Sequence, residues 1–269
     1  MKGILVYNAQ GVKRNEWYIN KLKNGFKPLN VDLQLVVIDN EDLQLNNIPD
    51  FAIVRVIAPN INKRLEDNGV RVFNNYLTSG IANDKWQTYL MCRKLGIPVL
   101  DTRSGSECSS ISNYPCIVKS IDGCGGKEVF MANNSTEYGQ IAHSFKQLNK
   151  RFIIQRPCSE QGKDMRLYML GGQVVASILR HNPNNFKSNY SLGGNAQKAV
   201  PTDYQIEIAA KIYKYLKCDY VGVDFIIDNG KWVLNEIEDV VGARMLYANT
   251  DIDIAEEYVR YIIFSMLNK

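Results

Sequence analysis

The chain has 269 residues, of which 45% are hydrophobic, and a formal net charge of +4. This length and composition predict a globular protein with one large core or two moderate ones, and they exclude an intrinsically disordered chain. Six cysteines without a Cys-x-x-Cys pair and only two histidines argue against zinc ribbons, redox motifs, disulfide frameworks and histidine-based metal sites or triads.

Partners and location follow from the same features. The mild positive charge comes without a basic run or an RNA-binding aromatic motif, so we expect anionic ligands and no nucleic acid. No apolar stretch reaches the length of a membrane span, and the apolar run after Met1 is too short for a signal peptide. We therefore expect a cytoplasmic protein with no membrane partner. Whether the chain forms a homo-oligomer stays open.

The first 79 residues alternate short strands with helical stretches. Strands are predicted over residues 3–7, 33–37 and 51–56, and helices over 17–22 and 61–68. This alternation predicts a small α/β domain with a parallel sheet. A helix over 84–95 follows, with Asn83 as its N-cap and Gly96 at its end, and the break before it predicts a domain boundary near residue 80.

The middle of the chain predicts a compact unit followed by further strands. The unit comprises a hairpin over 116–119 and 128–131, a helix over 136–148 and a strand over 152–155, and it is small enough to be a mobile lid. Strands over 167–169 and 174–179 then lead into a long polar loop over 180–194, and loops of that length are often functional. A capping box at Thr202 predicts another helix, and a last amphipathic helix closes the chain.

Three acidic side chains flank an Asn-Gly pair in the C-terminal third of the chain. Asp224 precedes the pair, and Glu236 and Glu238 follow it, each within an apolar run. An Asn-Gly pair in this setting is a strong signal of a β-hairpin. The register of that hairpin decides whether the three carboxylates share a face.

Two turn lengths give opposite outcomes. A two-residue turn would pair Asp224 with Asn235 and send the two glutamates to the other face, because side chains alternate along a strand. A three-residue loop of Asp228, Asn229 and Gly230 would pair Asp224 with Leu234 and place all three carboxylates on one face. We favour the three-residue loop.

Three carboxylates on one face would repel each other unless a cation lies among them. Oxygen ligands without a nearby His or Cys favour magnesium over zinc, and magnesium usually accompanies a phosphorylated ligand. The alternative is an ordinary solvated face of a hairpin.

Two lysines stand where a phosphate group would be held. Lys119 ends a predicted strand beside the glycine-rich turn of residues 123–126, whose backbone amides suit phosphates although the turn is not a Walker A loop. Lys85 lies in the first turn of its helix, where a cation opposes the helix dipole unless an anion binds there. An ordinary hairpin turn and a solvated lysine explain the same residues.

Two further stretches add polar groups. Gln155-Arg156-Pro157 interrupts the sheet and frees backbone groups for an adenine edge, although a simple strand end accounts for it equally well. The long loop brings together Arg180, His181, Lys187 and Asn189, which suit phosphates or a substrate carboxylate.

In this order, the segments resemble the RimK-type branch of the ATP-grasp superfamily, which comprises carboxylate-amine ligases. The motifs are Asn83-Asp84-Lys85, Val118-Lys119, Ile154-Gln155, Gly162 to Arg166, Phe186 to Asn189 with Gly193-Gly194, Gly222-Val223-Asp224 and Asn235 to Glu238. The resemblance covers essentially the whole chain. It implies the α/β fold class, in the α+β arrangement of ATP-grasp proteins. A small N-terminal parallel α/β domain would span residues 1–79, and an ATP-grasp domain would span 80–269. The lid subdomain of the latter would cover about 113–156.

The resemblance also implies cofactors and the residues that bind them. ATP would be bound by Lys85, Lys119, Gln155, Arg156, Pro157, Asp164 and Lys187. Magnesium, as one or two ions and with manganese as an alternative, would be bound by Asp224, Glu236 and Glu238. In this family a substrate carboxylate attacks the γ-phosphate to give an acyl phosphate, and an amine then displaces phosphate from it to form an amide.

We therefore expect an ATP- and magnesium-dependent ligase that joins a small-molecule or peptide carboxylate to an amine. Arg180, Asn189 and Arg244 are the catalytic candidates, and Arg55 could also reach the site. The alternatives are an ATP-binding regulatory module without ligase turnover, and a ligase that modifies a ribosomally made precursor peptide.

The chain departs from the family pattern in three places. Glu238 stands where the family usually has Asn, Lys187 stands where it has Arg, and residues 239–245 replace a Ser-Pro-Gly turn. The extra carboxylate changes the charge of the expected metal site, and lysine lacks the bidentate geometry of arginine.

Overall fold

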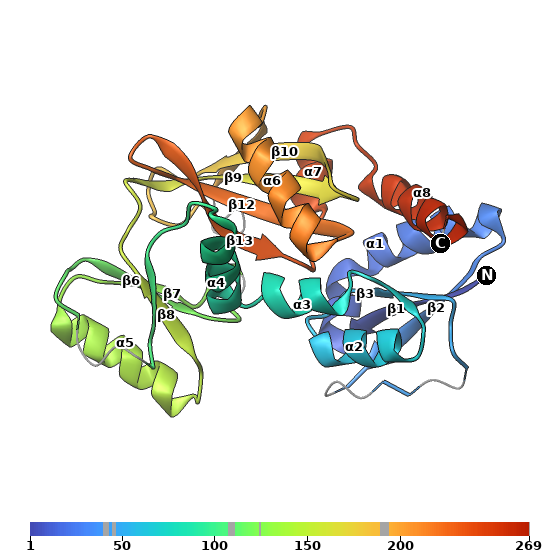
Figure 1. Cartoon of the computed structure of the whole chain (residues 1–269), viewed down its shortest axis with the longest axis horizontal. Helices are drawn as coiled ribbons and strands as arrows, with labels where there is room; N and C mark the ends of the chain where they lie inside the picture. Colours follow the sequence, from blue (N-terminus) through green and yellow to red (C-terminus); the bar gives the residue numbers. More distant parts are fainter. Residues whose placement is uncertain (40–42, 45–46, 107–110, 124, 189–193, 269) are drawn as a thin grey trace.

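A computed structural model describes residues 1–39, 43–44, 47–106, 111–123, 125–188 and 194–268. The chain folds around three sheets, which Figure 1 shows as one N-terminal sheet, one sheet at the opposite end and a third between and above them. No helix in these described ranges is long and apolar enough to cross a membrane.

The N-terminal sheet is parallel, with the strand order β2-β1-β3-β4. Its elements are β1 (Lys2–Asn8), α1 (Ala9–Phe26), the short 3-10 helix η1 (Lys27–Leu29), β2 (Asp32–Ile38), β3 (Phe51–Val54), α2 (Pro59–Asp67) and β4 (Arg71–Phe73). The central strands β1 and β3 are buried on both faces, which explains their continuous apolar runs, whereas the edge strand β2 is partly exposed. Leu5 and Tyr7 face helix α1, whereas Ile4 and Val6 face α2. The parallel α/β unit predicted for this part is confirmed, although β4 was not predicted.

The second sheet is antiparallel and has the order β5-β8-β6-β7. Its elements are β5 (Thr102–Ser104), β6 (Cys116–Ser120), β7 (Val129–Ala132), α5 (Ser135–Gln147) and β8 (Phe152–Gln155). Tyr138, Ala142 and Phe145 of α5 pack on one face of this sheet and form its core. The predicted hairpin, helix and strand are all present; the domain and lid boundaries stay predictions.

The third sheet is antiparallel, with the order β11-β10-β9-β12-β13. Its strands are β9 (Glu160–Leu170), β10 (Gln173–His181), β11 (Asn195–Lys198), β12 (Tyr220–Asp228) and β13 (Lys231–Glu238). The helices around it are α3 (Tyr76–Ala82), α4 (Lys85–Leu95), α6 (Asp203–Leu216), α7 (Arg244–Asn249) and α8 (Ile254–Leu267). Helices α4 and α6 cover one face, and α8 packs against α1 (Figure 1).

Helix caps agree with the sequence in one case and differ in another. The capping box at Thr202 and Gln205 starts α6 as predicted. The helix predicted over 84–95 is α4, but its N-cap is Asp84 instead of Asn83, because the Asp84 side chain accepts the backbone N–H of Gln87. Gly96 ends that helix in the left-handed conformation, as predicted.

The predicted turn of the acidic hairpin is wrong, although the predicted outcome is right. Asn229 and Gly230 both have positive φ and form a two-residue turn, so Asp228 pairs with Lys231. A β-bulge then shifts the register, because Asn235 is left without a ladder partner and Asp224 pairs with Glu236. The bulge, and not a longer turn, therefore places the three carboxylates on one face.

Candidate active site

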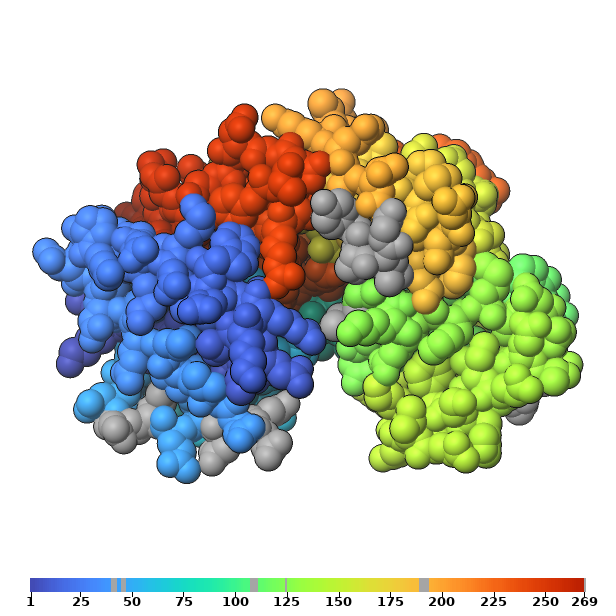
Figure 2. All heavy atoms as spheres, turned by 180° about the vertical axis from the view of Figure 1, so that it is seen from behind, coloured from blue at the N-terminus to red at the C-terminus, as the bar shows by residue number. Residues whose placement is uncertain are grey.

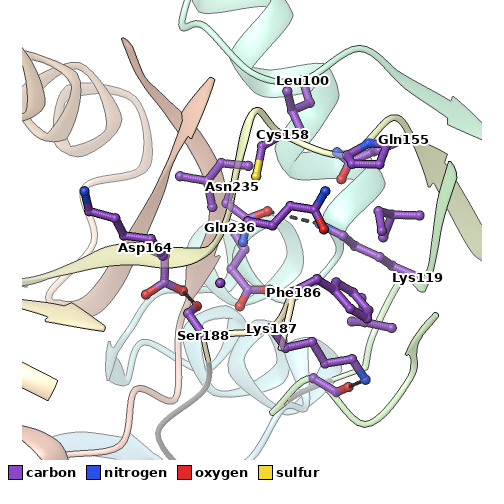
Figure 3. Close-up of a pocket in the computed structure, with 18 of the residues that line it drawn as sticks. Leu100, Lys119, Gln155, Cys158, Asp164, Phe186, Lys187, Ser188, Asn235 and Glu236 are labelled. Atoms are coloured by element: carbon purple, nitrogen blue, oxygen red, sulfur yellow. Dashed lines mark hydrogen bonds between the residues drawn. The ribbon is translucent and has the colours of Figure 1, made fainter. Parts of the chain in front are cut away.

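A pocket lies where the second sheet faces the third. Its walls come from β6, β7, β8, β9, β10, β12 and β13, together with the glycine-rich turn after β6. Counting its open mouth, it encloses about 830 Å³ of space. Figure 3 shows the side chains that line the pocket. Figure 2 shows, from behind, a separate and wider hollow between the N-terminal residues and the second sheet, below the C-terminal residues.

The charges that line the pocket favour an anion. Among the described lining residues, six side chains are cationic and two are acidic. The cations are Lys85, Lys119, Arg156, Lys163, Arg180 and Lys187, and the acids are Asp164 and Glu236. A cleft with this imbalance raises the local concentration of a negatively charged ligand. Phosphate groups are therefore suited to it.

Lys85 and Lys119 converge on the acidic strand β13. The Nζ of Lys85, at the start of α4, donates to the Gly123 carbonyl at 2.6 Å and lies 3.4 Å from Oε2 of Glu236. The Nζ of Lys119 donates to Oδ1 of Asn235 at 3.1 Å (Figure 3). Burial lowers the pKa of Lys119 to about 8, and Glu236 only partly opposes this effect. Both lysines line the pocket, and their contacts with phosphates stay a prediction.

The connection from β8 to β9 forms another wall and contains a polar atom without a partner. The Nε2 of Gln155 donates to Oγ1 of Thr102 at 2.7 Å, but its buried Oε1 accepts no hydrogen bond from any described residue. A buried carbonyl oxygen at a pocket wall suits an exocyclic amino group such as that of adenine. Arg156 forms a bidentate ion pair with Asp228 and, with Pro157, also lines the pocket.

The start of the long loop is fixed against the glycine-rich turn. Gly162 of β9 has a positive φ, and a Cβ added there would lie 2.4 Å from the Asn182 carbonyl oxygen. The close approach of the long loop to β9 therefore requires a glycine at this position. The Gly162 N–H donates to the Phe186 carbonyl, and the next residue, Lys187, donates through Nζ to Gly126 at 2.8 Å. Burial lowers the pKa of Lys187. Lys187 thus links the long loop to the glycine-rich turn.

The three predicted metal ligands lie together. One carboxylate oxygen from each of Asp224, Glu236 and Glu238 lies within 4.8 Å of the others. This all-oxygen donor set fits a hard divalent cation such as magnesium. Glu236 belongs to this carboxylate cluster and also lines the pocket, so the cluster adjoins the place where phosphates would be held.

Two buried arginines also contact the cluster. Arg166 donates from Nε and Nη2 to both oxygens of Asp224 at 2.7 Å, and its Nη2 donates to Glu238 at 2.6 Å. Arg180 donates from Nη2 to Asp224 at 2.6 Å and forms a bidentate pair with Asp164. Burial alone would raise the pKa of Asp224, but the two arginines outweigh it and lower that pKa to about 2.

The remaining carboxylates of the site respond differently to burial. Burial raises the pKa of Glu238 despite the attraction of Arg166. It also raises the pKa of Asp164, although Arg180 and the Ser188 hydroxyl, which donates at 2.5 Å, act in the opposite direction (Figure 3). Asp164 lines the pocket, but its two oxygens are occupied by these protein donors.

Two predicted arginines lie away from the pocket wall. Arg244 is exposed at the start of α7, donates to the Arg14 carbonyl and is not among the lining residues. Arg55 is buried between tyrosine rings and donates to the Val241 carbonyl at 2.6 Å. Asn189 lies outside the described residues, so its catalytic role stays a prediction.

Two residues of the site had no role assigned from the sequence. Asn235 is the bulge residue and accepts from Lys119. Arg166 bridges Asp224 and Glu238. Arg166 could have been found, because it lies two residues after Asp164 on a strand and therefore points to the same face. The position of Asn235 depends on a bulge that the sequence does not signal.

Comparisons with known proteins report on the family of this chain. The family model described as RimK-like ATP-grasp domain matches residues 82–262. The chain is 30% identical over 208 residues to a probable alpha-L-glutamate ligase of Haemophilus influenzae, covering 74% of this chain and 69% of that protein. It is 28% identical over 245 residues to N-acetylaspartylglutamate synthase A of Homo sapiens, covering 84% of this chain but 62% of the human protein.

Solved structures share the fold. A D-alanine–D-alanine ligase from Bacillus anthracis complexed with ATP superposes with a TM-score of 0.77 at 16% identity, covering 100% of this chain and 98% of that chain. The ATP-grasp ligase PsnB, complexed with a phosphomimetic variant of its minimal precursor, Mg and ADP, gives a TM-score of 0.66 at 13% identity, covering 98% of each chain. With the match over residues 82–262, these findings show that the chain belongs to the RimK-like ATP-grasp family of ligases, whose members form carbon–nitrogen bonds.

Proposed function

We propose that this chain is an ATP- and magnesium-dependent ligase that joins a carboxylate to an amine through an acyl phosphate. The observation that carries the proposal is the position of Glu236. This side chain lies in the carboxylate cluster and lines the cation-rich pocket, and its Oε2 is 3.4 Å from the Nζ of Lys85. One place thus combines groups for a metal ion with groups for the phosphates that the metal would neutralise.

Each side chain has a distinct part in this proposal. Lys85 and Lys119 hold the phosphates by charge, and the free Oε1 of Gln155 accepts from adenine. Bound magnesium, as one or two ions, would neutralise charge that develops on the transferred phosphoryl group. The protein contributes position and charge, because this chemistry needs no covalent catalysis by a side chain.

Arg180 is the catalytic candidate that lies at the pocket wall. Its guanidinium is held by Asp164 and Asp224, so its orientation does not depend on the ligand. A fixed cation at this position is suited to an acyl phosphate or a substrate carboxylate. Arg244 would need a rearrangement to take this part, because it donates to Arg14 on the surface.

Release of ADP in the presence of paired acids and amines tests the proposal. L-Glutamate is the first amine to include, because both relatives carry glutamate in their names. We expect ADP only when both substrates are present, and a Glu236→Gln variant should lose at least about a hundredfold in turnover. An unchanged melting temperature of the variant would show that the fold is intact.

The binding-only alternative gives a different result. A protein that holds ATP tightly and releases no ADP with any acid–amine pair would be a nucleotide-binding module. Full activity of Glu236→Gln would refute the metal assignment even if ADP is formed by the parent protein.

A further inference from the structure

Arg166 places a positive charge inside the carboxylate cluster. Its Nη2 donates to Asp224 at 2.7 Å and to Glu238 at 2.6 Å, so one nitrogen bridges two of the three carboxylates. Its Nε donates to the second oxygen of Asp224. A divalent cation that used both carboxylates would have to compete with this nitrogen.

A second arginine binds the same Asp224 carboxylate. Arg180 donates to Asp224 at 2.6 Å and to Asp164 at 2.7 Å. Arg166, Arg180, Asp164 and Asp224 are all nearly inaccessible to solvent, with exposures of 7%, 4%, 5% and 0%. Such paired and buried charges resist displacement, because removal of one partner leaves the other charge uncompensated.

The charges around the cluster are balanced without a metal ion. The cluster and Asp164 carry four negative charges when ionised, and Arg166, Arg180, Lys85 and Lys119 carry four positive charges when protonated. A divalent cation alone would therefore make the site strongly positive. A nucleotide brings the negative charge that restores the balance.

We propose that Arg166 is an internal counter-ion that keeps free divalent cations out of the carboxylate cluster, so that metal enters only together with the nucleotide phosphates. The proposal rests on the proposed function for the metal site. Glu238 takes part in this exclusion of free cations, because its carboxylate is the second acceptor of the Arg166 Nη2. Arg166 acts on metal binding through the carboxylates and is a positioning residue.

Binding of Mn²⁺, measured by the electron paramagnetic resonance signal of the free ion, tests this proposal without turnover. In the absence of nucleotide, Arg166→Met should bind Mn²⁺ at least about tenfold more tightly than the parent protein, because a repelling charge is removed from the site. Arg166→Lys keeps a cation and should stay close to the parent protein. A gain of affinity cannot come from a misfolded variant.

Arg260→Met is the matched control, since it removes one positive charge from the exposed face of α8. Equal gains in Arg260→Met and Arg166→Met, or no gain in Arg166→Met, would overturn the proposal. A parallel titration with a non-hydrolysable ATP analogue separates the two hypotheses. Failure of the parent protein to bind Mn²⁺ with the analogue would refute the metal site itself, whereas binding there without a gain in Arg166→Met would refute only the role of Arg166.

Discussion

Burial and the charge of a neighbouring carboxylate have opposite effects on the pKa of Lys119. Its ammonium group lies at the end of β6, bonded to Asn235 and close to Glu236 and Lys85. Burial and Lys85 favour the neutral amine, and Glu236 favours the ammonium, with the result that the pKa falls to about 8. A bound phosphate would favour the ammonium, so nucleotide binding and protonation of this lysine are linked.

This linkage predicts how nucleotide affinity depends on pH. Above about pH 8 the free protein loses the Lys119 proton, so binding must take a proton up and the dissociation constant for ATP rises, by at most about tenfold per pH unit. Lys119→Arg keeps its charge throughout this range and should show a flatter profile. Calorimetric titrations between pH 7 and pH 10 measure both profiles, and identical slopes would refute the role of Lys119.

At the residue scale, the sequence predicted most of the polar groups that line the pocket. Four of the predicted residues lie at a helix start, at strand ends or in the long loop, where polar side chains often face a ligand. All four line the pocket: Lys85, Lys119, Gln155 and Lys187. Arg244 does not line the described pocket, because it contacts Arg14 on the surface through segments far apart in the sequence, and its catalytic role stays a prediction. Contacts of that kind have no local sequence signal.

At the scale of elements, the hairpin of β12 and β13 decides the geometry of the site. Its turn is short, and the bulge at Asn235 turns Glu236 to the face that carries Asp224. The sequence indicated the hairpin and the shared face, but it did not indicate the bulge, because a one-residue bulge and a longer turn shift the register by the same amount. Local pattern thus predicted the elements better than their register.

The two-residue turn makes a prediction about stability. Gly230 has a φ of +72°, and no heavy atom of the described residues lies within 4 Å of an added Cβ, so Gly230→Ala introduces only backbone strain. We expect the free energy of unfolding to fall by about 1 kcal/mol. Gly80→Ala, within helix α3 and equally free of contacts, should raise it by a similar amount. Urea denaturation measures both, and equal effects of the two variants would contradict this turn.

At the scale of the whole molecule, the N-terminal sheet shares its core with the C-terminus. Tyr18 and Leu22 of α1 belong to one buried cluster with Tyr258 and Val259 of α8, and Tyr220 of the third sheet joins them. The sequence predicted the order of these units and the amphipathic last helix. It did not predict their contact, because complementary apolar faces do not identify their partners.

The shared core predicts that residues 1–79 do not fold alone. Without α8, the face of α1 that carries Tyr18 and Leu22 would be exposed to water. A fragment of residues 1–79 should therefore show no cooperative thermal transition by circular dichroism, whereas the whole chain should show one. A cooperative transition in the fragment would contradict this account of the core.

Transfer of ¹⁸O tests the central claim most directly. The acid of an accepted acid–amine pair is labelled with ¹⁸O at both carboxylate oxygens, and the released phosphate is analysed by mass spectrometry. We predict one ¹⁸O atom in each phosphate and one in each amide, because the phosphate that the amine displaces from the acyl phosphate keeps one former carboxylate oxygen. Amide formation with phosphate free of ¹⁸O would contradict the proposed reaction.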